Sequence, residues 1–317
     1  MKIACIEKKG QLQVGVVRER DILILQDAYR HFKKKLAPHP VLPVHVFTYP
    51  PCFIENFPRI KKIVLEILAI AEKSPGKSGF ALPLSRVRLK APIPKPGSIY
   101  CMARNYTDHI LEFEARVMEQ DKMVPQIFMK PRTCVTGPGG PVVLPRMGRQ
   151  IDWEAELAVV IGKKAKYVSR EKALSHVFGY VCMLDISERG LKIRERTEDR
   201  GRDKFFDWLN GKWMDTFAPQ GPWIVTRDEI RDPQDLDITL AVNGVQKQNG
   251  NTGQMIFPVA EIISYLSHLA TLLPGDIIST GTPSGVGAPK EEFLKDGDTV
   301  EMRIGKIGTL AVKVKKE

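Results

Sequence analysis

The most informative segment of the 317-residue chain runs from Ile151 to Ile161 and reads Ile-Asp-Trp-Glu-Ala-Glu-Leu-Ala-Val-Val-Ile. Its apolar second half predicts a buried β-strand. Alternate residues of a strand face the same side, so Glu154 and Glu156 should project side by side. Two carboxylates ~4 Å apart repel each other by roughly 4 kcal/mol at a surface-like effective dielectric constant. A folded protein tolerates such a pair on an open surface or with a cation between the carboxylates.

A third carboxylate, Asp185, directly follows the apolar segment Phe178–Leu184, which also predicts a strand. Solvation alone is a poor explanation for an acidic side chain at the end of a buried strand. Three carboxylates without a nearby His or Cys would form an oxygen-only site, which suits Mg²⁺, with Mn²⁺ or Ca²⁺ as alternatives. The spacing also fits Glu154 and Glu156 on a solvated strand face and Asp185 in a turn.

His109 and Glu112 lie three residues apart, shortly after the predicted strand Ile99–Met102. If a helix begins at Thr107 or Asp108, the two side chains share one helix face. A carboxylate that accepts from one imidazole nitrogen leaves the other free to take a proton from water. The pair therefore fits a general base, and it also fits an ion pair on a helix surface. The charged residues 111–126 that follow are interpreted as a mobile lid or as an ordinary surface segment.

A glycine-rich turn follows the predicted strand Ile277–Thr280 and includes Gly281, Thr282 and Gly285. It lacks the Gly-Lys-Ser/Thr sequence of a P-loop and the spacing and strand–helix context of a dinucleotide site. Its backbone N–H groups and the Thr282 hydroxyl could approach a small carboxylate or enolate. A tight turn that simply requires glycine is the alternative.

Short strands outnumber helices along the chain. We expect strands at 3–6, 12–17, 22–25, 99–102, 126–129, 154–161, 178–184, 236–242, 245–248, 277–280, 299–304 and 309–314, and helices at 58–73, 171–176 and 259–269. The apolar stripe of the first helix should end at Ser74-Pro75-Gly76, and Asn243-Gly244 predicts a tight hairpin. Without a regular βαβ repeat, the order predicts a β-rich α+β fold. Prolines between residues 83 and 96 predict a linker between an N-terminal domain, residues 1–90, and a catalytic domain, residues 91–317.

The net charge of +11 is concentrated in residues 1–90, which carry 17 Lys and Arg and 7 Asp and Glu. Such a surface could attract nucleic acid or acidic substrates. The runs Lys33–Lys35 and Lys61-Lys62 lack interleaved aromatic residues, so we favour a solvated face. The five cysteines are scattered without a CxxC pair, and no segment has the pattern of a signal peptide or a membrane span. These features predict a cytoplasmic protein with free thiols.

Taken in order, the motifs resemble the fumarylacetoacetate hydrolase family over roughly residues 97–312. Each motif is weak alone, but about nine of them in the family order are specific. They are Arg104-Asn105-Tyr106 with His109 and Glu112; Phe128-Met129-Lys130-Pro131; residues 152–162; Gly179-Tyr180 with Asp185, Ser187 and Arg189; Lys212 with Asp215-Thr216-Phe217; Gly221-Pro222-Trp223; Val242-Asn243-Gly244; Met255-Ile256-Phe257; and Pro274-Gly275-Asp276 through Gly281-Thr282-Pro283 to Gly285-Val286-Gly287.

The resemblance implies a mixed β-roll that carries the active site, with a smaller N-terminal α/β domain, in a homodimer. It also assigns roles to residues of three kinds. It implies that Mg²⁺ is held by Glu154, Glu156 and Asp185, that His109, Glu112 and Lys212 are catalytic, and that Arg104, Tyr106, Arg189, Gly281 and Thr282 contact the substrate.

The reaction implied is metal-dependent hydrolysis of a C–C bond in a small β-diketo acid, of the acylpyruvate or 2,4-diketo acid type, through a metal-bound enolate. Decarboxylation or isomerisation of 2-oxo or 2-hydroxymuconate-type acids, or a ureidoglycolate lyase-like activity, is the alternative. The expected partners are a small oxo-acid and a second copy of the chain, with no nucleic acid and no membrane. The rival outside enzymology is an anion- or nucleic-acid-binding module built on the basic N-terminal third.

The chain departs from the family pattern after Arg189. Many relatives have an acid and then a glutamine where this chain has Gly190 and Lys192. The charged residues 192–204 do not align with the family, so the substrate contacts there are open. Ser187-Glu188-Arg189, together with Gly211-Lys212 and Asp215-Thr216-Phe217, resembles the branch that acts on diketo sugar acids or ureidoglycolate-like molecules more than the acylpyruvase branch.

Overall fold

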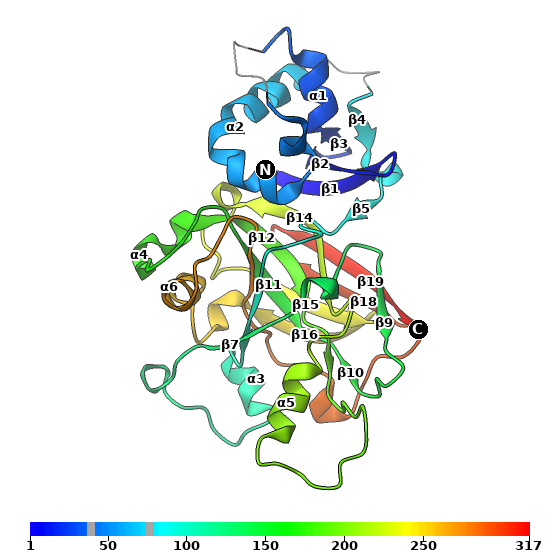
Figure 1. Cartoon of the computed structure of the whole chain (residues 1–317), viewed down its shortest axis with the longest axis vertical. Coiled ribbons are helices and arrows are strands. Elements are labelled where there is room, and N and C mark those ends of the chain that lie inside the picture. Colours follow the sequence, from blue (N-terminus) through cyan, green and yellow to red (C-terminus); the bar gives the residue numbers. More distant parts are fainter. Residues whose placement is uncertain (37–41, 74–78) are drawn as a thin grey trace.

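The computed structural model describes residues 1–36, 42–73 and 79–317, so the predicted stop signal Ser74-Pro75-Gly76 lies outside the described residues. A small α/β part lies above a larger β-rich part in Figure 1. The small part contains β1 (Lys2–Lys8), β2 (Gln11–Val17), β3 (Asp21–Ile24), α1 (Leu25–Phe32), α2 (Pro50–Glu72), β4 (Ala81–Pro83) and β5 (Leu89–Lys90).

The larger part contains most of the strands and four further helices of the described chain. They are β6 (Ile99–Ala103), α3 (Thr107–Leu111), β7 (Gln126–Met129), β8 (Val135–Thr136), β9 (Pro141–Leu144), β10 (Ile151–Asp152), β11 (Ala155–Ile161), α4 (Arg170–Ala173), β12 (Val177–Leu184), β13 (Ser187–Glu188), α5 (Asp203–Asn210), β14 (Ala218–Thr226), β15 (Asp237–Val242), β16 (Val245–Asn251), α6 (Val259–Leu269), β17 (Ile277–Ser279), β18 (Thr299–Ile304) and β19 (Gly308–Lys316).

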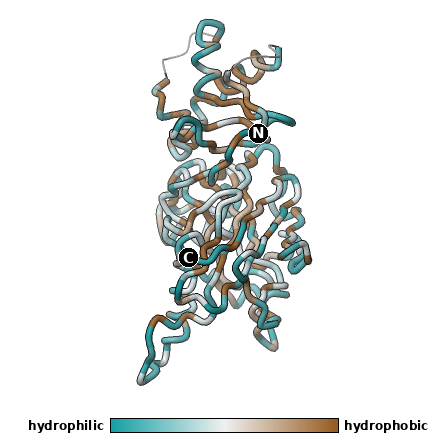
Figure 2. The backbone as a smooth tube through the Cα atoms, turned by 90° about the vertical axis from the view of Figure 1, so that its right-hand side faces the viewer, coloured by the Kyte–Doolittle hydropathy of each residue, from teal (hydrophilic) through white to brown (hydrophobic). Residues whose placement is uncertain are grey.

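One 12-stranded sheet runs through both parts, in the order β4-β3-β2-β1-β14-β12-β11-β17-β6-β7, with β5 paired to β1 and β8 to β14. A five-stranded sheet, β16-β15-β18-β19-β9, accompanies it, and β10 pairs with β13. The predicted β-rich α+β fold is therefore confirmed. In Figure 2 the loops that project at the lower end are coloured in large part as hydrophilic.

The two parts share more than a sheet, because α2 packs against the sheet of the larger part. The rings of Phe53 and Phe57 lie 6.3 and 5.1 Å from the ring of Phe178 in β12. These phenylalanines extend the predicted apolar stripe toward the N-terminus, so α2 begins at Pro50 rather than at residue 58. Proline is tolerated in the first turn of a helix, where its missing N–H has no partner to lose.

Other predicted bounds hold to different degrees. The predicted helix 259–269 and the strand 126–129 coincide with α6 and β7, and the Asn243-Gly244 hairpin forms with φ of 52° and 78°. Leu25, expected at the end of a strand, instead begins α1, a helix that the sequence pattern does not predict. The strand β14 was also missed, although it joins the two parts of the sheet. In the described ranges, no helix combines the length and apolar character that a membrane span requires.

Candidate active site

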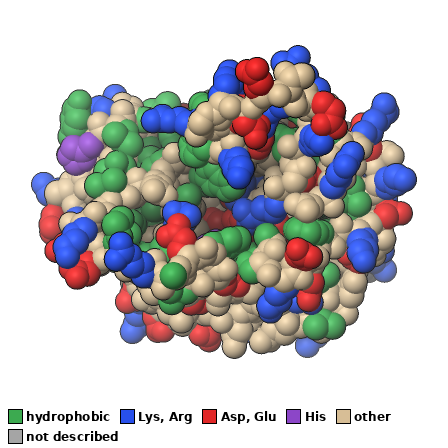
Figure 3. Space-filling view, turned by 90° about the horizontal axis from the view of Figure 1, so that it is seen from below, with side chains coloured by type: hydrophobic (Ala, Val, Ile, Leu, Met, Phe, Trp, Pro, Cys, Tyr) green, Lys and Arg blue, Asp and Glu red, His purple; other side chains and the backbone are tan. Residues whose placement is uncertain are grey.

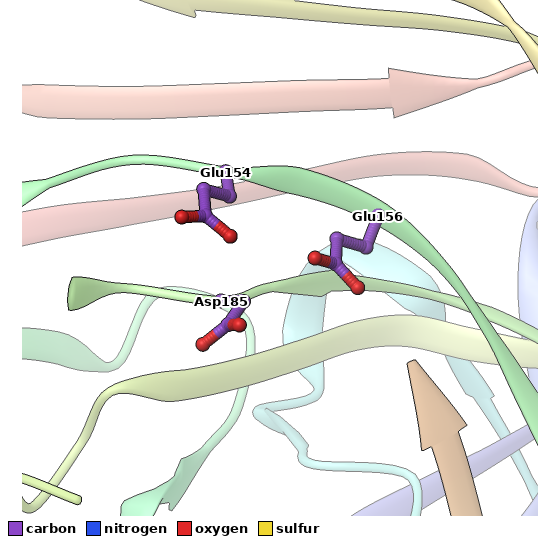
Figure 4. Close-up of side chains that lie close together, drawn as sticks. All are labelled: Glu154, Glu156 and Asp185. Atoms are coloured by element: carbon purple, nitrogen blue, oxygen red, sulfur yellow. The ribbon is translucent and has the colours of Figure 1, made fainter. Parts of the chain in front are cut away.

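The three predicted metal ligands meet because β11 and β12 pair antiparallel with Ala155 opposite Leu184. This register places Glu154, just before β11, beside Asp185, just after β12, and the Asp185 N–H donates to the Glu154 carbonyl at 2.9 Å. Glu156 faces the same side as Glu154, as the strand periodicity requires. One carboxylate oxygen from each residue lies within 4.8 Å of the others, and all three residues are buried (Figure 4).

Buried cations surround this acidic triad. Lys212 Nζ donates to Glu154 Oε2 and to Asp185 Oδ2, both at 2.9 Å. Lys130 Nζ lies 2.5 Å from the other oxygen of Asp185 and donates to the carbonyl of Ile186 at 3.0 Å. Arg189 bridges Glu154 to the fully buried Asp152, which its Nε reaches at 3.0 Å. These contacts place positive charge directly against Asp152, Glu154 and Asp185.

The two glutamates respond to this environment in opposite ways. Burial opposes ionisation of Glu154, but the charges of Lys212 and Arg189 outweigh burial and lower its pKa to about 2. Burial, reinforced by the negative charges of Asp185 and Glu154, raises the pKa of Glu156 to about 8. Without a metal ion beside it, Glu156 therefore carries a proton at neutral pH.

One atom of Glu156 shows where a metal ion fits. Its Oε2 accepts hydrogen bonds from Ser279 Oγ at 2.6 Å and from the Gly281 N–H at 2.8 Å. Its Oε1 is buried and has no hydrogen-bond partner among the described residues. Most buried polar atoms have a hydrogen-bond partner, so this oxygen is free to bind a ligand. With oxygen-only donors from three carboxylates, the site suits a hard divalent cation. These residues therefore form a metal-binding acidic triad.

The predicted histidine–glutamate pair forms on α3, which begins at Thr107 as expected. His109 Nδ1 lies 2.9 Å from Glu112 Oε2, and both side chains are largely buried. The other oxygen of Glu112 accepts from the Gly285 N–H at 2.7 Å, and Asp108 Oδ2 accepts from Ser284 Oγ at the same distance. The glycine-rich turn therefore fixes the carboxylates of Asp108, in α3, and of Glu112, directly after α3, and through Glu112 it orients the imidazole.

A cavity of about 830 Å³ opens between α3 and α5 and joins the pair to the triad. Figure 3 shows that this face is hollowed, with hydrophobic side chains beside charged ones. Its polar side is formed by His109, Glu154, Glu156, Arg189, Lys212 and Thr282, and its apolar side mainly by Phe113, Ile127, Phe128, Met129, Phe205, Trp208, Leu209 and Trp213.

The residues predicted to contact substrate are placed differently from one another. Arg104, Arg189 and Thr282 line the cavity, although Arg104 is ion-paired with Glu114. Gly281 has φ of +92°, and its N–H is engaged with Glu156. Tyr106 is fully buried in the hydrophobic core and is not among the residues that line the cavity. The structure therefore brings four of these five residues to the site and leaves Tyr106 behind it.

Several site residues were given no role from the sequence. Lys130 and Asp152 lie inside motifs of the family pattern, which was the available signal for them. Ser279, which holds Glu156, carried no signal beyond its place in a strand. The aromatic residues of α5 directly follow the charged residues 192–204, which do not align with the family. Three aromatic residues in the sequence Phe205-Phe206-Asp207-Trp208, next to a charged segment, are the signal that could have indicated a binding surface.

Comparisons with known proteins agree with this geometry. The family model described as "Fumarylacetoacetate (FAA) hydrolase C-terminal" matches residues 98–315. A 2,4-didehydro-3-deoxy-L-rhamnonate hydrolase of Sphingomonas sp. (strain SKA58) is 43% identical over 79% of this chain and 84% of its own length. A mitochondrial oxaloacetate tautomerase of Homo sapiens is 39% identical over 78% of this chain and 76% of its own.

Solved structures are similar over the whole chain. Maleylpyruvate hydrolase from Sphingobium sp. SYK-6, in complex with manganese(II) ion and pyruvate, superposes with a TM-score of 0.74 and 32% identity, covering 100% of this chain and 99% of its own. A 2-hydroxyhepta-2,4-diene-1,7-dioate isomerase from Mycobacterium marinum has a TM-score of 0.70 and 30% identity over 100% and 99% of the two chains. The relatives thus include hydrolases, a tautomerase and an isomerase, and the manganese complex supports a divalent metal in the acidic triad.

Proposed function

This chain belongs to the fumarylacetoacetate hydrolase family, and from that premise we propose that it is a divalent-metal-dependent hydrolase that cleaves a C–C bond in a small β-diketo acid. One observation carries the proposal: His109, held by Glu112, lines the same cavity as two carboxylates of the acidic triad, Glu154 and Glu156. A general base and a metal site that face one cavity can act on the same small molecule.

The contacts in the site suggest a separate role for the metal ion and for each catalytic side chain. A divalent cation held by Glu154, Glu156 and Asp185 would supply Lewis-acid chemistry to the oxygens of an oxo-acid. Because Nδ1 of His109 faces Glu112, its Nε2 is the atom that takes a proton from water. The Glu112 carboxylate, 2.9 Å from Nδ1, stabilises the imidazolium that results. Lys212, buried between Glu154 and Asp185, offsets negative charge that develops on the substrate.

The names of relatives support this reaction class. The rhamnonate hydrolase and the maleylpyruvate hydrolase are both named as hydrolases of small acids. We propose Mg²⁺ as the metal, with Mn²⁺ or Ca²⁺ as alternatives, because the oxygen-only donor set suits all three. A small oxo-acid substrate, a homodimer and a cytoplasmic location remain predictions from the sequence. The human relative is named as a mitochondrial protein.

Tautomerisation or isomerisation of an oxo-acid is the second candidate, and the same pair of side chains favours it. A base that can take a proton from water can also move a proton between the carbon and the oxygen of an enol. The human relative is named as an oxaloacetate tautomerase. Decarboxylation of a 2-oxo acid would use the same polar side of the cavity.

A small substrate panel separates these outcomes. Acetylpyruvate, oxaloacetate, a 2,4-diketo sugar acid and ureidoglycolate would be incubated with the enzyme and Mg²⁺, Mn²⁺ or EDTA, and products would be followed by NMR. Glu154→Ala serves as the metal-site variant. Metal-dependent formation of two acid fragments, absent from the variant, supports hydrolysis. Enol–keto exchange without fragments would replace hydrolysis by tautomerisation. No turnover, together with no bound divalent metal by elemental analysis, would overturn the enzyme proposal.

A further inference from the structure

We propose that the substrate carries an apolar acyl group, aryl or medium-length alkyl, on the side of the diketo unit that points away from its carboxylate. The group would be bound by the aromatic wall, which we define as Phe113, Phe128, Phe205, Trp208 and Trp213. This inference rests on the proposed function, because the acidic triad and His109 must hold the reacting end of the molecule.

The aromatic wall starts directly beside the polar groups of the cavity. Lys212 Nζ lies 5.2 Å from the ring centroid of Phe128 and 5.9 Å from that of Trp208. The Phe128 and Trp208 rings meet edge to face, with centroids 5.2 Å apart, and Phe205 continues the surface at 5.8 Å from Trp208. A substrate whose reacting end lies at Lys212 therefore extends along aromatic rings.

Two rings of the aromatic wall are exposed to solvent and could be covered by the acyl group of a substrate. Phe205 is 54% exposed and Trp213 is 44% exposed, although both line the cavity. Apolar surface that is exposed to water is unfavourable. An apolar acyl group would cover these rings and gain affinity from the burial, whereas a polyhydroxylated chain would lose hydrogen bonds to water on the same surface.

The charges of the cavity argue against a second carboxylate at the far end of the substrate. Among the described residues that line the cavity, the lysine and arginine side chains are Arg104, Arg189 and Lys212, and each is already ion-paired with a carboxylate. Glu114 neutralises Arg104, and Glu154 and Asp185 neutralise Lys212. A distal carboxylate would therefore lose its hydration without gaining an unpaired cation.

The first test compares kcat/KM for acetylpyruvate, hexanoylpyruvate, benzoylpyruvate, maleylpyruvate and a 2,4-diketo sugar acid. We expect the benzoyl and hexanoyl substrates to exceed acetylpyruvate by roughly tenfold or more, as expected for added apolar surface in an apolar pocket. Phe205→Ala should reduce this ratio severalfold. Phe206→Ala is the matched control, because Phe206 is a similarly exposed neighbour on α5 that does not line the cavity. It should leave the ratio unchanged.

A binding measurement separates failure of this inference from failure of the proposed reaction. Isothermal titration of the metal-loaded protein would compare oxamate with N-phenyloxamate, two unreactive oxo-acid analogues that differ in an aryl group. At least tenfold tighter binding of N-phenyloxamate, reduced in Phe205→Ala and not in Phe206→Ala, supports the aromatic wall even if none of the diketo acids is hydrolysed. Hydrolysis with equal rates for all acyl groups, a preference for maleylpyruvate or the sugar acid, or equal effects of the two variants would overturn it.

Discussion

Glu112 places Oε2 2.9 Å from Nδ1 of His109, while its Oε1 is held by the N–H of Gly285 at 2.7 Å. The two contacts link the imidazole to the glycine-rich turn through one side chain. A histidine oriented in this way presents a fixed ring nitrogen to the cavity, as a general base requires. The arrangement makes the contribution of Glu112 measurable apart from that of the metal site.

Glu112→Gln should lower kcat by roughly 10²-fold or more, because an amide cannot stabilise the imidazolium as a carboxylate does. Its carbonyl oxygen can still accept from Gly285, so the fold should be retained. Bound metal, measured by elemental analysis, should stay at the wild-type level. Glu119→Gln, at an exposed position in the segment after α3, is the control and should keep wild-type kcat. Loss of metal together with kcat in Glu112→Gln would contradict a role confined to His109.

Glu156→Gln should remove metal binding without weakening the metal-free protein. The raised pKa of Glu156 means that its side chain is protonated at pH 7 when no cation is present, and glutamine resembles that neutral form. Ser279 and Gly281 can still donate to the amide oxygen. Thermal denaturation with and without 5 mM Mg²⁺ or Mn²⁺ measures the effect. The wild type should gain about 2.7 kcal/mol at a metal concentration of 100 Kd, and the variant should gain nothing. An unchanged metal-induced shift in Tm would exclude Glu156 as a ligand.

The same carboxyl group predicts how metal binding depends on pH. Its pKa is about 8 in the metal-free folded state and about 4.3 in an unfolded chain. Between these values the folded state holds the extra proton, so this group makes the metal-free protein less stable as pH rises. A cation displaces the proton, so its affinity should fall by about tenfold for each pH unit below 8. The metal-induced increase in Tm should therefore be larger at pH 8 than at pH 6, and an equal increase would contradict it.

Lys130 offers a test of the buried charge network. Its ammonium group is fully buried between Asp185 and the carbonyl of Ile186. Lys130→Met leaves the Asp185 oxygen without this partner, and removal of one member of a buried pair costs about 3–5 kcal/mol of unfolding free energy. Urea denaturation of the metal-free protein measures the cost. Lys122→Met, at an exposed ion pair with Glu119, should change stability by less than about 0.5 kcal/mol. Similar values for both variants would show that Lys130 is not a structural cation.

Local patterns predicted much of the catalytic part, because they depend on neighbours in the chain. Alternation placed Glu154 and Glu156 on one face, and helical spacing placed His109 beside Glu112. The pairing register of β11 and β12, which brings Asp185 to Glu154, cannot be derived from local sequence patterns. Only the resemblance to the family predicted that these two carboxylates lie together.

The misses have the same physical origin. Lys130 reaches Asp185 across a large sequence separation, and no local pattern distinguishes it from a surface lysine. The helix α1 begins directly at the end of β3, where a run of apolar residues fits strand or helix equally well. The strand β14 contains Gly221 and Pro222, which usually interrupt strands, and its partners β1 and β12 come from both parts of the molecule.

The pairing of β1 with β14 has a consequence for how the protein unfolds. The family model starts at residue 98, yet Ile3 pairs with Ile224, and one hydrophobic cluster combines Phe53 with Phe178 and Val160. Heating should therefore melt the chain in one cooperative step rather than as two separate modules. A fragment cut at the family boundary would bare an unpaired strand edge at β14, which invites aggregation. The start of the family match at residue 98 is therefore not a boundary between two parts that fold independently.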